Sequence, residues 1–313
     1  MASRCLICGR PLAGGEDDYH KSCLQGLFGS ETAPAFAYST EELNRLAREL
    51  VLARMSVPGV QAKLSVHVER GTGGADRMTL VGLDGNYILK LPTETYPELP
   101  EAEHFAMTLA RSCGIATADF GLVRLEAGRL AYVTRRMDRE DGVKHMEDMC
   151  QLTERRTERK YYGSYEQIAK CIWRHCSEPG QDIVSFFEEV LFCFLIGNSD
   201  MHLKNFSLIR EHDGEWRLSR AYDLVPVKTV MPTDEDDLAL TINGKNRKLT
   251  VGDFRKACSS MRLTDVQFTR TLRRIAKGVS AHLDEAFDRS FLTDGFKQRC
   301  RDLILVRLRM CTI

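Results

Sequence analysis

Hydrophobic and polar positions along the chain separate a strand-rich stretch from a helix-rich one. Between residues 39 and 135, short apolar runs alternate with turn residues, and their spacing predicts both helices and strands. The predicted elements are a helix from Ser39, strands over 62–69, 78–83 and 87–91, a helix over 101–113, and strands over 121–125 and 130–135. Asp84-Gly85-Asn86 and Ala127-Gly128 are typical hairpin turns, so each is expected to join the two strands that flank it.

After residue 135 the apolar positions mostly recur with the 3.6-residue period of a helix. The predicted helices cover 164–175, 182–196, 251–261, 264–287 and 294–310. One predicted hairpin interrupts them, with strands over 206–210 and 216–219 around Asp213-Gly214. This order predicts an α+β fold with a mixed α/β N-lobe over 39–135 and a mainly helical C-lobe over 136–313.

Composition limits the classes of protein to which the chain can belong. Its 313 residues suggest two domains, or one domain with two lobes. The 44 basic and 44 acidic side chains cancel, which argues against a protein that mainly coats nucleic acid. The longest apolar run, Val190–Ile196, is far shorter than the ~20 residues that span a bilayer, so no membrane association is expected. Because the 11 cysteines are odd in number and no signal core precedes them, we expect a cytoplasmic protein.

The first 30 residues have a different character from the rest and offer little to build a core. Cys5, Cys8, His20 and Cys23 form two short ligand pairs separated by a loop, which is a typical zinc spacing. This pattern predicts a zinc-knuckle-like segment over 1–30 that holds a structural Zn²⁺, followed by a linker over 31–38. Unligated thiols beside a chance histidine are the alternative. The other eight cysteines show no paired pattern and are expected mostly in the core.

The segment 196–209 carries the most chemistry. A buried helix is predicted to end at Gly197, and a polar loop with Asp200 and Asn205 follows, in the Asp-x4-Asn spacing of a kinase catalytic loop. In such a loop the aspartate accepts a hydroxyl proton and the asparagine holds a metal ion. Asp223, after the next hairpin, is a candidate second ligand for the metal. Taken alone, Asp-x4-Asn is also explained by a helix cap and a turn residue.

Two further residues of this loop are candidates for catalysis. His202 is expected to orient the loop backbone or to contact substrate, and the structural role is favoured. Lys204 is expected to neutralise the transferring phosphoryl group.

Lys90 ends a predicted strand with apolar neighbours on both sides. Burying this lysine is costly unless it meets an anion, such as the phosphates of ATP or a carboxylate on the next helix. Glu103 is the candidate partner, and Glu101 is the second choice. A lysine that reaches from the strand end to water is the alternative. Upstream, residues 56–63 form a loop before the first strand; with a single glycine it is a poor phosphate-loop signal.

Together these residues resemble the HipA-like serine/threonine kinases, the toxins of bacterial type II toxin–antitoxin modules. The resemblance covers residues 50–290. It is carried by Ser-Val-Pro-Gly-Val-Gln-Ala-Lys (56–63), Ile-Leu-Lys-Leu-Pro (88–92), Arg-Met-Asp-Arg (136–139), Glu-Asp-Met-Cys-Gln (147–151), the loop 196–207 and Tyr-Asp-Leu (222–224). The resemblance implies a two-lobed protein-kinase-like fold and phosphoryl transfer from Mg²⁺-ATP to a protein hydroxyl.

The resemblance also implies roles for particular positions. Asp200 corresponds to the catalytic aspartate, Asn205 and Asp223 to the Mg²⁺ ligands, and Lys90 to the lysine on the ATP phosphates. Further ATP-binding residues are implied in the loop (Ser56, Val57, Gly59, Gln61 and Lys63) and in the hinge that meets adenine (Thr134, Arg136 and Met137). Ser56 matches the serine whose autophosphorylation switches these kinases off, because a phosphoserine there repels the ATP phosphates.

The implied substrate is an aminoacyl-tRNA synthetase, and the implied partner is a HipB-like helix-turn-helix antitoxin through which DNA is contacted only indirectly. About 50 residues precede the phosphate loop, so the N-terminal subdomain of about a hundred residues found in long HipA proteins is expected to be absent. The chain then resembles short toxins whose missing part is a separate small HipS-like protein. A small-molecule kinase and a non-catalytic antitoxin-binding co-repressor are the alternatives.

Overall fold

The computed structural model describes residues 3–36, 38–39, 41–43, 45–46, 61, 63–71, 76–81 and 84–311. The described chain forms two compact units. The first unit comprises 1–105, 118–140 and 287–292, and the second comprises 106–117, 141–286 and 293–313. The α+β class expected from the sequence is confirmed, since strands dominate the first unit and helices the second. Among the described residues, no helix is both long and apolar enough to cross a membrane.

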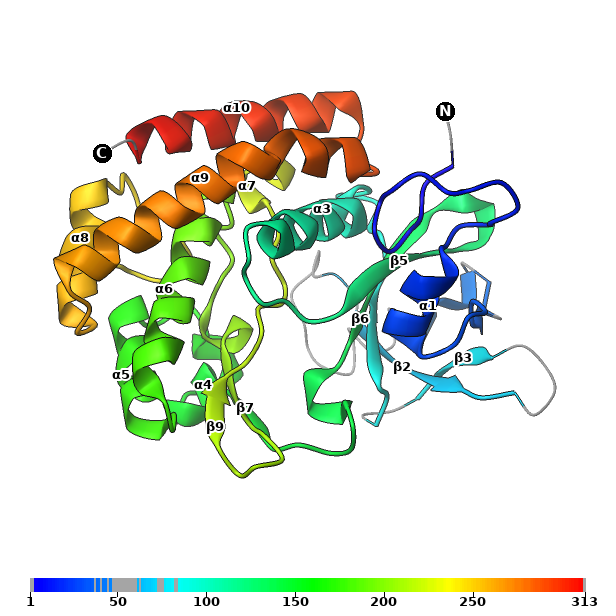
Figure 1. Cartoon of the computed structure of the whole chain (residues 1–313), viewed down its shortest axis with the longest axis horizontal. Helices are drawn as coiled ribbons and strands as arrows, with labels where there is room; N and C mark the ends of the chain where they lie inside the picture. The colour runs from blue at the N-terminus through cyan, green and yellow to red at the C-terminus, as the bar shows by residue number, and fades with distance from the viewer. Residues whose placement is uncertain are drawn as a thin grey trace. The chain divides into compact units, whose positions relative to one another are not determined.

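A six-stranded sheet forms the centre of the first unit. Its strands stand in the order β1-β3-β2-β4-β6-β5, and all neighbours are antiparallel except the pair β1 and β3. The strands are β1 (Ala35–Phe36), β2 (Lys63–Glu69), β3 (Arg77–Leu80), β4 (Tyr87–Lys90), β5 (Phe120–Arg124) and β6 (Leu130–Arg135). The short helix α1 (Lys21–Phe28) and the first part of α3 (Leu99–Ser112) complete this unit (Figure 1).

The predicted hairpin around Asp84-Gly85-Asn86 is wrong. The strands β3 and β4 do not pair with each other, because β2 lies between them and pairs with both. The connection crosses close to β2, where the Gly85 N–H donates to Ser65 Oγ (3.0 Å). A Cβ on Gly85 would lie 2.5 Å from the Val66 carbonyl oxygen, so the close crossing requires glycine at this position. The turn residues therefore mark a crossing over the neighbouring strand.

Two expectations for the N-terminal residues also need correction. Residues 35–36 of the predicted linker form β1, which pairs in parallel with β3. The first 30 residues contribute to the core of the unit, because Leu6, Leu24, Leu27 and Phe28 are buried. Composition hid this core, since its apolar residues are few and are separated by polar ones.

Other sequence expectations for the first unit agree with the structure. The hairpin around Ala127-Gly128 forms from β5 and β6. Ser39 and Glu42 make the contacts of a capping box, with the Glu42 N–H on Ser39 Oγ at 3.2 Å and the Ser39 N–H on Glu42 Oε2 at 2.8 Å. Most of the helix predicted after Ser39 lies outside the described residues.

The second unit combines a three-stranded antiparallel sheet, in the order β7-β8-β9, with most of the helices. The strands are β7 (Met146–Asp148), β8 (Ser207–Arg210) and β9 (Trp216–Leu218). The helices are α4 (Met149–Leu152), α5 (Tyr165–His175), α6 (Pro179–Ile196), α7 (Val227–Val230), α8 (Val251–Ser260), α9 (Asp265–Arg289, to Ala286 in this unit) and α10 (Asp294–Met310) (Figure 1). All five predicted helices form, whereas the short strand β7 carried no sequence signal.

The helix α6 is the buried centre of the second unit. Every residue from Glu189 to Ile196 is buried, so this half of the helix needs cover all round. It ends as predicted at Gly197, whose φ of 77° is a left-handed conformation that glycine adopts without strain. This sharp end releases the chain directly into the polar loop that carries Asp200 and Asn205.

Candidate active site

Within the first unit, Lys90 and Glu103 form a buried ion pair. The Lys90 Nζ lies 2.6 Å from Glu103 Oε1, and the two side chains are 4% and 1% exposed. Lys90 is the last residue of β4, and Glu103 lies in the first turns of α3. The Nζ also lies 5.3 Å from the centre of the Tyr132 ring on β6. The pairing expected from the sequence therefore forms, and it places a cation at the end of a central strand.

The second-choice partner, Glu101, does not take this position. Burial raises the pKa of its carboxyl group from 4.5 to about 7. A lysine beside this carboxyl group would lower its pKa, so the raised pKa agrees with a Glu101 that is not paired with Lys90.

The loop before β2 is described only in part. Ser56, Val57 and Gly59 lie outside the described residues. Gln61 Nε2 donates to the carbonyl oxygen of Leu91 at 2.9 Å, which ties the end of the loop to the residue after Lys90. Lys63 begins β2 directly opposite Lys90, and its side chain is exposed. These two candidates therefore lie beside Lys90, whereas the position of Ser56 stays a prediction.

The predicted hinge follows β6. Thr134 is still in the sheet, and its hydroxyl donates to the carbonyl oxygen of Asp119 at 3.0 Å. The Arg136 N–H donates to the Asn86 carbonyl oxygen at 2.8 Å, and its guanidinium holds Asp138 through two hydrogen bonds of 3.0 and 2.7 Å. Met137 is buried. The Arg136 side chain is thus engaged locally, so the adenine contacts expected here would fall to the backbone.

Within the second unit, the loop after α6 holds Asp200 and Asn205 together. The Asn205 Nδ2 donates to the backbone carbonyl oxygen of Asp200 at 3.1 Å, and the Asp200 N–H donates to Asn198 Oδ1 at 3.2 Å. Asn205 is buried, while the Asp200 side chain is half-buried. The Asn205 amide nitrogen also lies 3.7 Å from Met201 Sδ, so both of these contacts use the nitrogen and not the amide oxygen. That arrangement suits an asparagine whose oxygen binds a cation.

Tyr161 is a site residue that the sequence analysis missed. Its hydroxyl donates to Asp200 Oδ1 at 2.6 Å, and its ring meets His202 edge to face, with 5.0 Å between ring centres. Burial, followed by the charge of Asp200, raises the pKa of the Tyr161 phenol well above its usual value. The charge of Asp223 contributes to the same shift, so both acidic candidates lie near one phenol. Tyr161 follows a run of mixed charges that gave no sign of this contact.

Lys204 is held by a second residue that was missed. Its Nζ lies 2.5 Å from Asp148 Oδ2, at the end of β7. Asp148 also caps α4 by accepting the Gln151 N–H at 3.0 Å, so its position is fixed by a helix start. The capping box Asp-x-x-Gln is a signal that could have marked this aspartate. Lys204 therefore reaches a carboxylate of its own unit.

His202 and the residue before Asp223 each contact a residue close to Asp200. His202 is buried, and its ring meets the Tyr161 ring edge to face, while its role stays a prediction. The residue before Asp223, Tyr222, donates its hydroxyl to the Lys204 carbonyl oxygen at 2.9 Å. Asp223 itself has a φ of 61°. The contact of Tyr222 thus brings the Asp223 loop beside the Asp200 loop.

The four N-terminal ligand candidates meet at one point of the first unit. The Sγ atoms of Cys5, Cys8 and Cys23 and a ring nitrogen of His20 all lie within 4.8 Å of one another. The distances from His20 Nδ1 to Sγ of Cys8 and Cys23 are 3.3 and 3.7 Å. A tetrahedral zinc with ordinary bond lengths needs sulfur–nitrogen separations of about 3.6 Å. The group therefore fits one metal ion.

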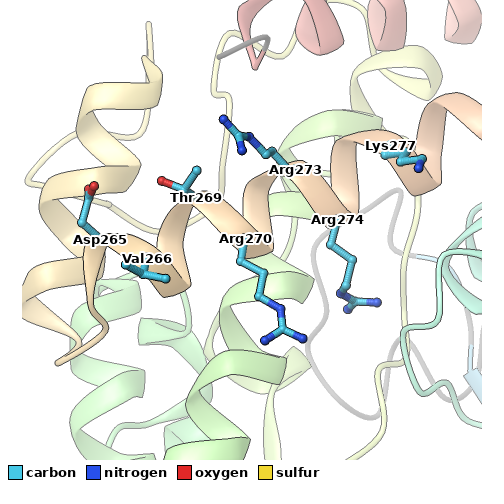
Figure 2. Close-up of a pocket in the computed structure, with 7 residues that line it drawn as sticks. All are labelled: Asp265, Val266, Thr269, Arg270, Arg273, Arg274 and Lys277. Carbon is cyan, nitrogen blue, oxygen red and sulfur yellow. The ribbon is translucent and has the colours of Figure 1, made fainter.

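A surface hollow of the second unit lies among residues outside the candidate set. It has a volume of about 540 Å³ and is lined by α9 residues including Arg270, Arg273, Arg274 and Lys277. Figure 2 shows Arg270 and Arg274 on one side of α9 and Arg273 on the opposite side. Arg274 is neutralised by an ion pair with Glu188. The basic side chains thus diverge, so this hollow does not form a phosphate site.

Comparison with known proteins identifies the class and then the family. The fold is that of kinase-like proteins: the Shewanella oneidensis HipA solved with HipB and operator DNA has a TM-score of 0.69 and 21% identity, covering 84% of this chain and 70% of that chain. The Helicobacter pylori proinflammatory kinase CtkA has a TM-score of 0.55 and 14% identity, covering 79% of this chain and 95% of that one. The model of the HipA-like C-terminal domain matches residues 55–284, so the chain belongs to that family.

Curated relatives carry kinase names. "Putative kinase Y4dM" of Sinorhizobium fredii is 34% identical over 209 residues, which is 63% of this chain and 50% of the relative. A "Putative kinase" of Haemophilus influenzae is 32% identical over 186 residues, which is 55% of this chain and 53% of the relative. The chain thus spans about half the length of these curated relatives. The region that the family model matches, residues 55–284, contains Lys90, Glu103, Asp200, Asn205 and Asp223.

Proposed function

We propose that the protein is a Mg²⁺-ATP-dependent serine/threonine protein kinase. The observation that carries the proposal is the loop after α6, where Asn205 is tied to the Asp200 backbone and both belong to the family region. An aspartate and an asparagine in this spacing are the proton acceptor and metal ligand of kinase loops. The buried pair of Lys90 and Glu103 supports the same function, because active kinases require a lysine held by a glutamate.

The proposed reaction is a direct phosphoryl transfer. The Asp200 carboxylate accepts the proton of a serine or threonine hydroxyl as its oxygen forms a bond to the γ-phosphorus of ATP. The bond from that phosphorus to the β–γ bridging oxygen breaks, and ADP leaves with the electron pair. Tyr161 already donates to Asp200 Oδ1, so it orients the carboxylate before the substrate hydroxyl binds.

The proposed nucleotide and metal contacts use the remaining candidates. Lys90 binds ATP phosphates, and Asn205 and Asp223 bind Mg²⁺ through oxygen atoms, which this cation prefers. The loop residues Ser56, Val57, Gly59, Gln61 and Lys63 cover the phosphates, and the backbone of 134–137 meets adenine. Because Asp148 balances the charge of Lys204, we propose that His202 and Lys204 orient the catalytic loop.

A second metal is proposed for the N-terminal segment. Cys5, Cys8, His20 and Cys23 hold Zn²⁺ as a structural cofactor, since three thiols and one imidazole favour zinc over Mg²⁺. Hydrogen bonds from the Cys23 and Cys8 thiols lower the pKa of the Cys5 thiol, which favours the thiolate that a metal binds.

The biological role is proposed from the family. The solved HipA relative is part of a toxin–antitoxin complex with HipB and operator DNA, which supports a HipB-like antitoxin as partner of this chain. An aminoacyl-tRNA synthetase is the proposed substrate, and its phosphorylation would stop growth. A separate small HipS-like protein is a further proposed partner. Autophosphorylation of Ser56 is the proposed off-switch, because a phosphate there repels ATP.

Phosphate mapping tests the catalytic proposal. The purified chain is incubated with Mg²⁺ and ATP, and its phosphorylated residues are identified by mass spectrometry. We expect phosphate on Ser56 in the wild type and a loss of at least about 1,000-fold in Asp200→Asn, which keeps the shape but removes the proton acceptor. Asp294→Asn, an exposed aspartate at the start of α10, serves as the matched control and keeps the wild-type rate.

The alternatives give different results. Phosphate that forms equally in Asp200→Asn would disprove the assigned base. ATP hydrolysis or transfer to a metabolite, with no phosphate on any protein, would indicate a small-molecule kinase. No use of ATP at all would indicate a non-catalytic partner of the antitoxin.

A further inference from the structure

The N-terminal segment, residues 3–29, packs along the edge of the sheet that carries Lys90. The strand β5 is last in the strand order, and its Leu122 N–H donates to the Leu6 carbonyl oxygen at 2.8 Å. In return, the Tyr19 hydroxyl donates to the Leu122 carbonyl oxygen at 3.1 Å. Arg124 of β5 holds Asp18 through two hydrogen bonds of 2.8 and 2.5 Å. The segment thus satisfies backbone groups that an edge strand otherwise exposes.

Leu122 and Lys90 belong to one row of directly opposed residues that crosses the sheet from strand to strand. Lys90 on β4 stands opposite Tyr132 on β6, and Tyr132 stands opposite Leu122 on β5. Directly opposed residues of a sheet share one face and pack against each other. Leu6, which ends the row, lies between two of the zinc ligands, Cys5 and Cys8. A shift of the ligand loop would therefore be transmitted along the row toward Lys90.

A second connection leads from the same loop to Glu103. The next residue, His104, has its Nε2 at 2.9 Å from the carbonyl oxygen of Ile7. Ile7 also lies between Cys5 and Cys8. The Gly121 position allows this close packing, because a Cβ there would lie 2.9 Å from Ile7 Cγ1. Both members of the Lys90–Glu103 pair are thus connected to the short loop between two metal ligands.

The side chains of the ligand loop are arranged for metal binding. His20 Nε2 lies 3.0 Å from the Pro11 carbonyl oxygen, which favours the tautomer with the proton on Nε2 and leaves Nδ1 to bind a metal. Cys5 Sγ accepts the His20 N–H at 3.4 Å. Apart from α1, the segment contains only turns and isolated bridges, so a bound metal would add to the contacts with β5 that hold residues 5–20.

We propose that zinc in this segment positions the Lys90–Glu103 pair, so that metal occupancy sets the affinity for ATP. The proposal rests on the proposed kinase function, and it assigns the metal a role beyond the folding of its own loop. Cys5, Cys8, His20 and Cys23 act as positioning residues, because none of them contacts the pair directly. The metal holds Leu6 and Ile7 in place. Leu6 in turn holds Leu122, and Ile7 holds His104. These two contacts position Lys90 and Glu103.

The test compares the zinc-loaded full chain with the same chain after chelation, and with Cys8→Ser. Zinc content is measured by elemental analysis, Mg²⁺-ATP affinity by calorimetry, and amide hydrogen exchange by mass spectrometry. We expect one zinc per chain, a Kd for ATP about tenfold higher without zinc, and kcat at saturating ATP changed less than about threefold. Exchange should rise in β5 and also in β4 and β6. Cys171→Ser, a cysteine on α5 outside this segment, is the matched control.

A second variant separates the contact from the metal. Gly121→Val is expected to keep zinc but to push Ile7 away from β5, and thus to raise the Kd for ATP as chelation does. A chain without zinc, or unchanged ATP affinity and unchanged exchange in β4 and β6 after zinc removal, would overturn the proposal. If the zinc-loaded chain binds no ATP, the kinase function fails, and the exchange in β4 and β6 alone decides whether zinc positions the pair.

Discussion

A buried carboxyl group on α6 is expected to make the stability of the protein depend on pH. Glu189 is 4% exposed, and its Oε1 has no hydrogen-bond partner among the described residues. Burial raises the pKa of this group from 4.5 to about 8. Between these values the folded chain keeps a proton that the unfolded chain releases. The free energy of unfolding therefore falls as the pH rises, by on the order of 5 kcal/mol once the pH exceeds 8.

Replacement of this residue should remove the dependence. Glu189→Gln cannot ionise, so we expect it to be more stable than the wild type at pH 9 and closer to it at pH 5. Urea unfolding at both pH values measures the difference. Glu158→Gln, at an exposed position, should keep the wild-type dependence. An equal fall in stability for Glu189→Gln and the wild type would show that another group is responsible.

At the level of single residues, sequence reasoning identified a charged group that is costly to bury without a partner. Lys90 was paired correctly with Glu103, because a lysine in an apolar strand needs an anion nearby. Tyr161 and Asp148 were missed because a tyrosine after a charged run, or an aspartate before a helix, is satisfied by water. Their contacts with Asp200 and Lys204 form only when distant segments meet. Nothing near Tyr161 in the sequence indicates its contact, and the capping box of Asp148 marks a helix start but not the contact with Lys204.

At the level of elements, the end of α6 depends on a glycine. Gly197 has a φ of 77°, and an added Cβ would lie 2.5 Å from Leu303 Cδ2 of α10. Gly197→Ala therefore suffers both backbone strain and a steric clash. We expect a loss of about 1–3 kcal/mol in the free energy of unfolding, measured in urea.

The same helix offers a control. Gly180, in the first turn of α6, has no atom within 4 Å of an added Cβ. Gly180→Ala should stabilise the chain by about 0.5–1 kcal/mol, because alanine loses less conformational freedom in a helix. In Gly197→Ala, a second change of Leu303→Ala relieves the clash but keeps the strain. A Gly197→Ala variant as stable as the wild type would contradict the account of this helix end.

Helices were predicted more accurately than strand pairing, for a physical reason. Hydrogen bonds of a helix are local, so the bounds of α10 could be read directly from residues 294–310. Strand pairing is non-local, and the spacing of β3 and β4 could not reveal that β2 lies between them. The strand β7 has three residues and is defined by its antiparallel pairing with β8. Short strands of this kind have no periodicity to detect.

At the level of the whole molecule, the candidate residues are shared between the two units. Lys90 and Glu103 belong to the first, and Asp200, Asn205 and Asp223 belong to the second. The order of motifs along the chain brought them into one hypothesis, and the family region contains them all. The division into segments at 1–30, 39–135 and 136–313 stays a prediction. So does the function of each site residue, because a fold and a family do not fix the chemistry.

Nucleotide binding by the full chain can be separated from catalysis. If ATP contacts Lys90 and Mg²⁺ contacts Asn205 and Asp223, saturating Mg²⁺-ATP should stabilise the folded chain. At a ligand concentration of 100 times Kd the gain is about 2.7 kcal/mol, which corresponds to a rise in melting temperature of about 5 °C for a chain of this size. Thermal unfolding followed by circular dichroism measures this rise.

Two variants and one chelator distinguish the parts of the proposed site. Asp200→Asn should keep the full rise, because in the proposed reaction the Asp200 carboxylate contacts the acceptor hydroxyl and not the nucleotide. Asp223→Asn should lose the part of the rise that depends on Mg²⁺, and EDTA added to the wild type should remove the same part. A rise that is unaffected by both Asp223→Asn and EDTA would mean that ATP binds without the proposed metal. The catalytic role of the loop would then have to be abandoned, whereas the Lys90 contact with phosphate would stand.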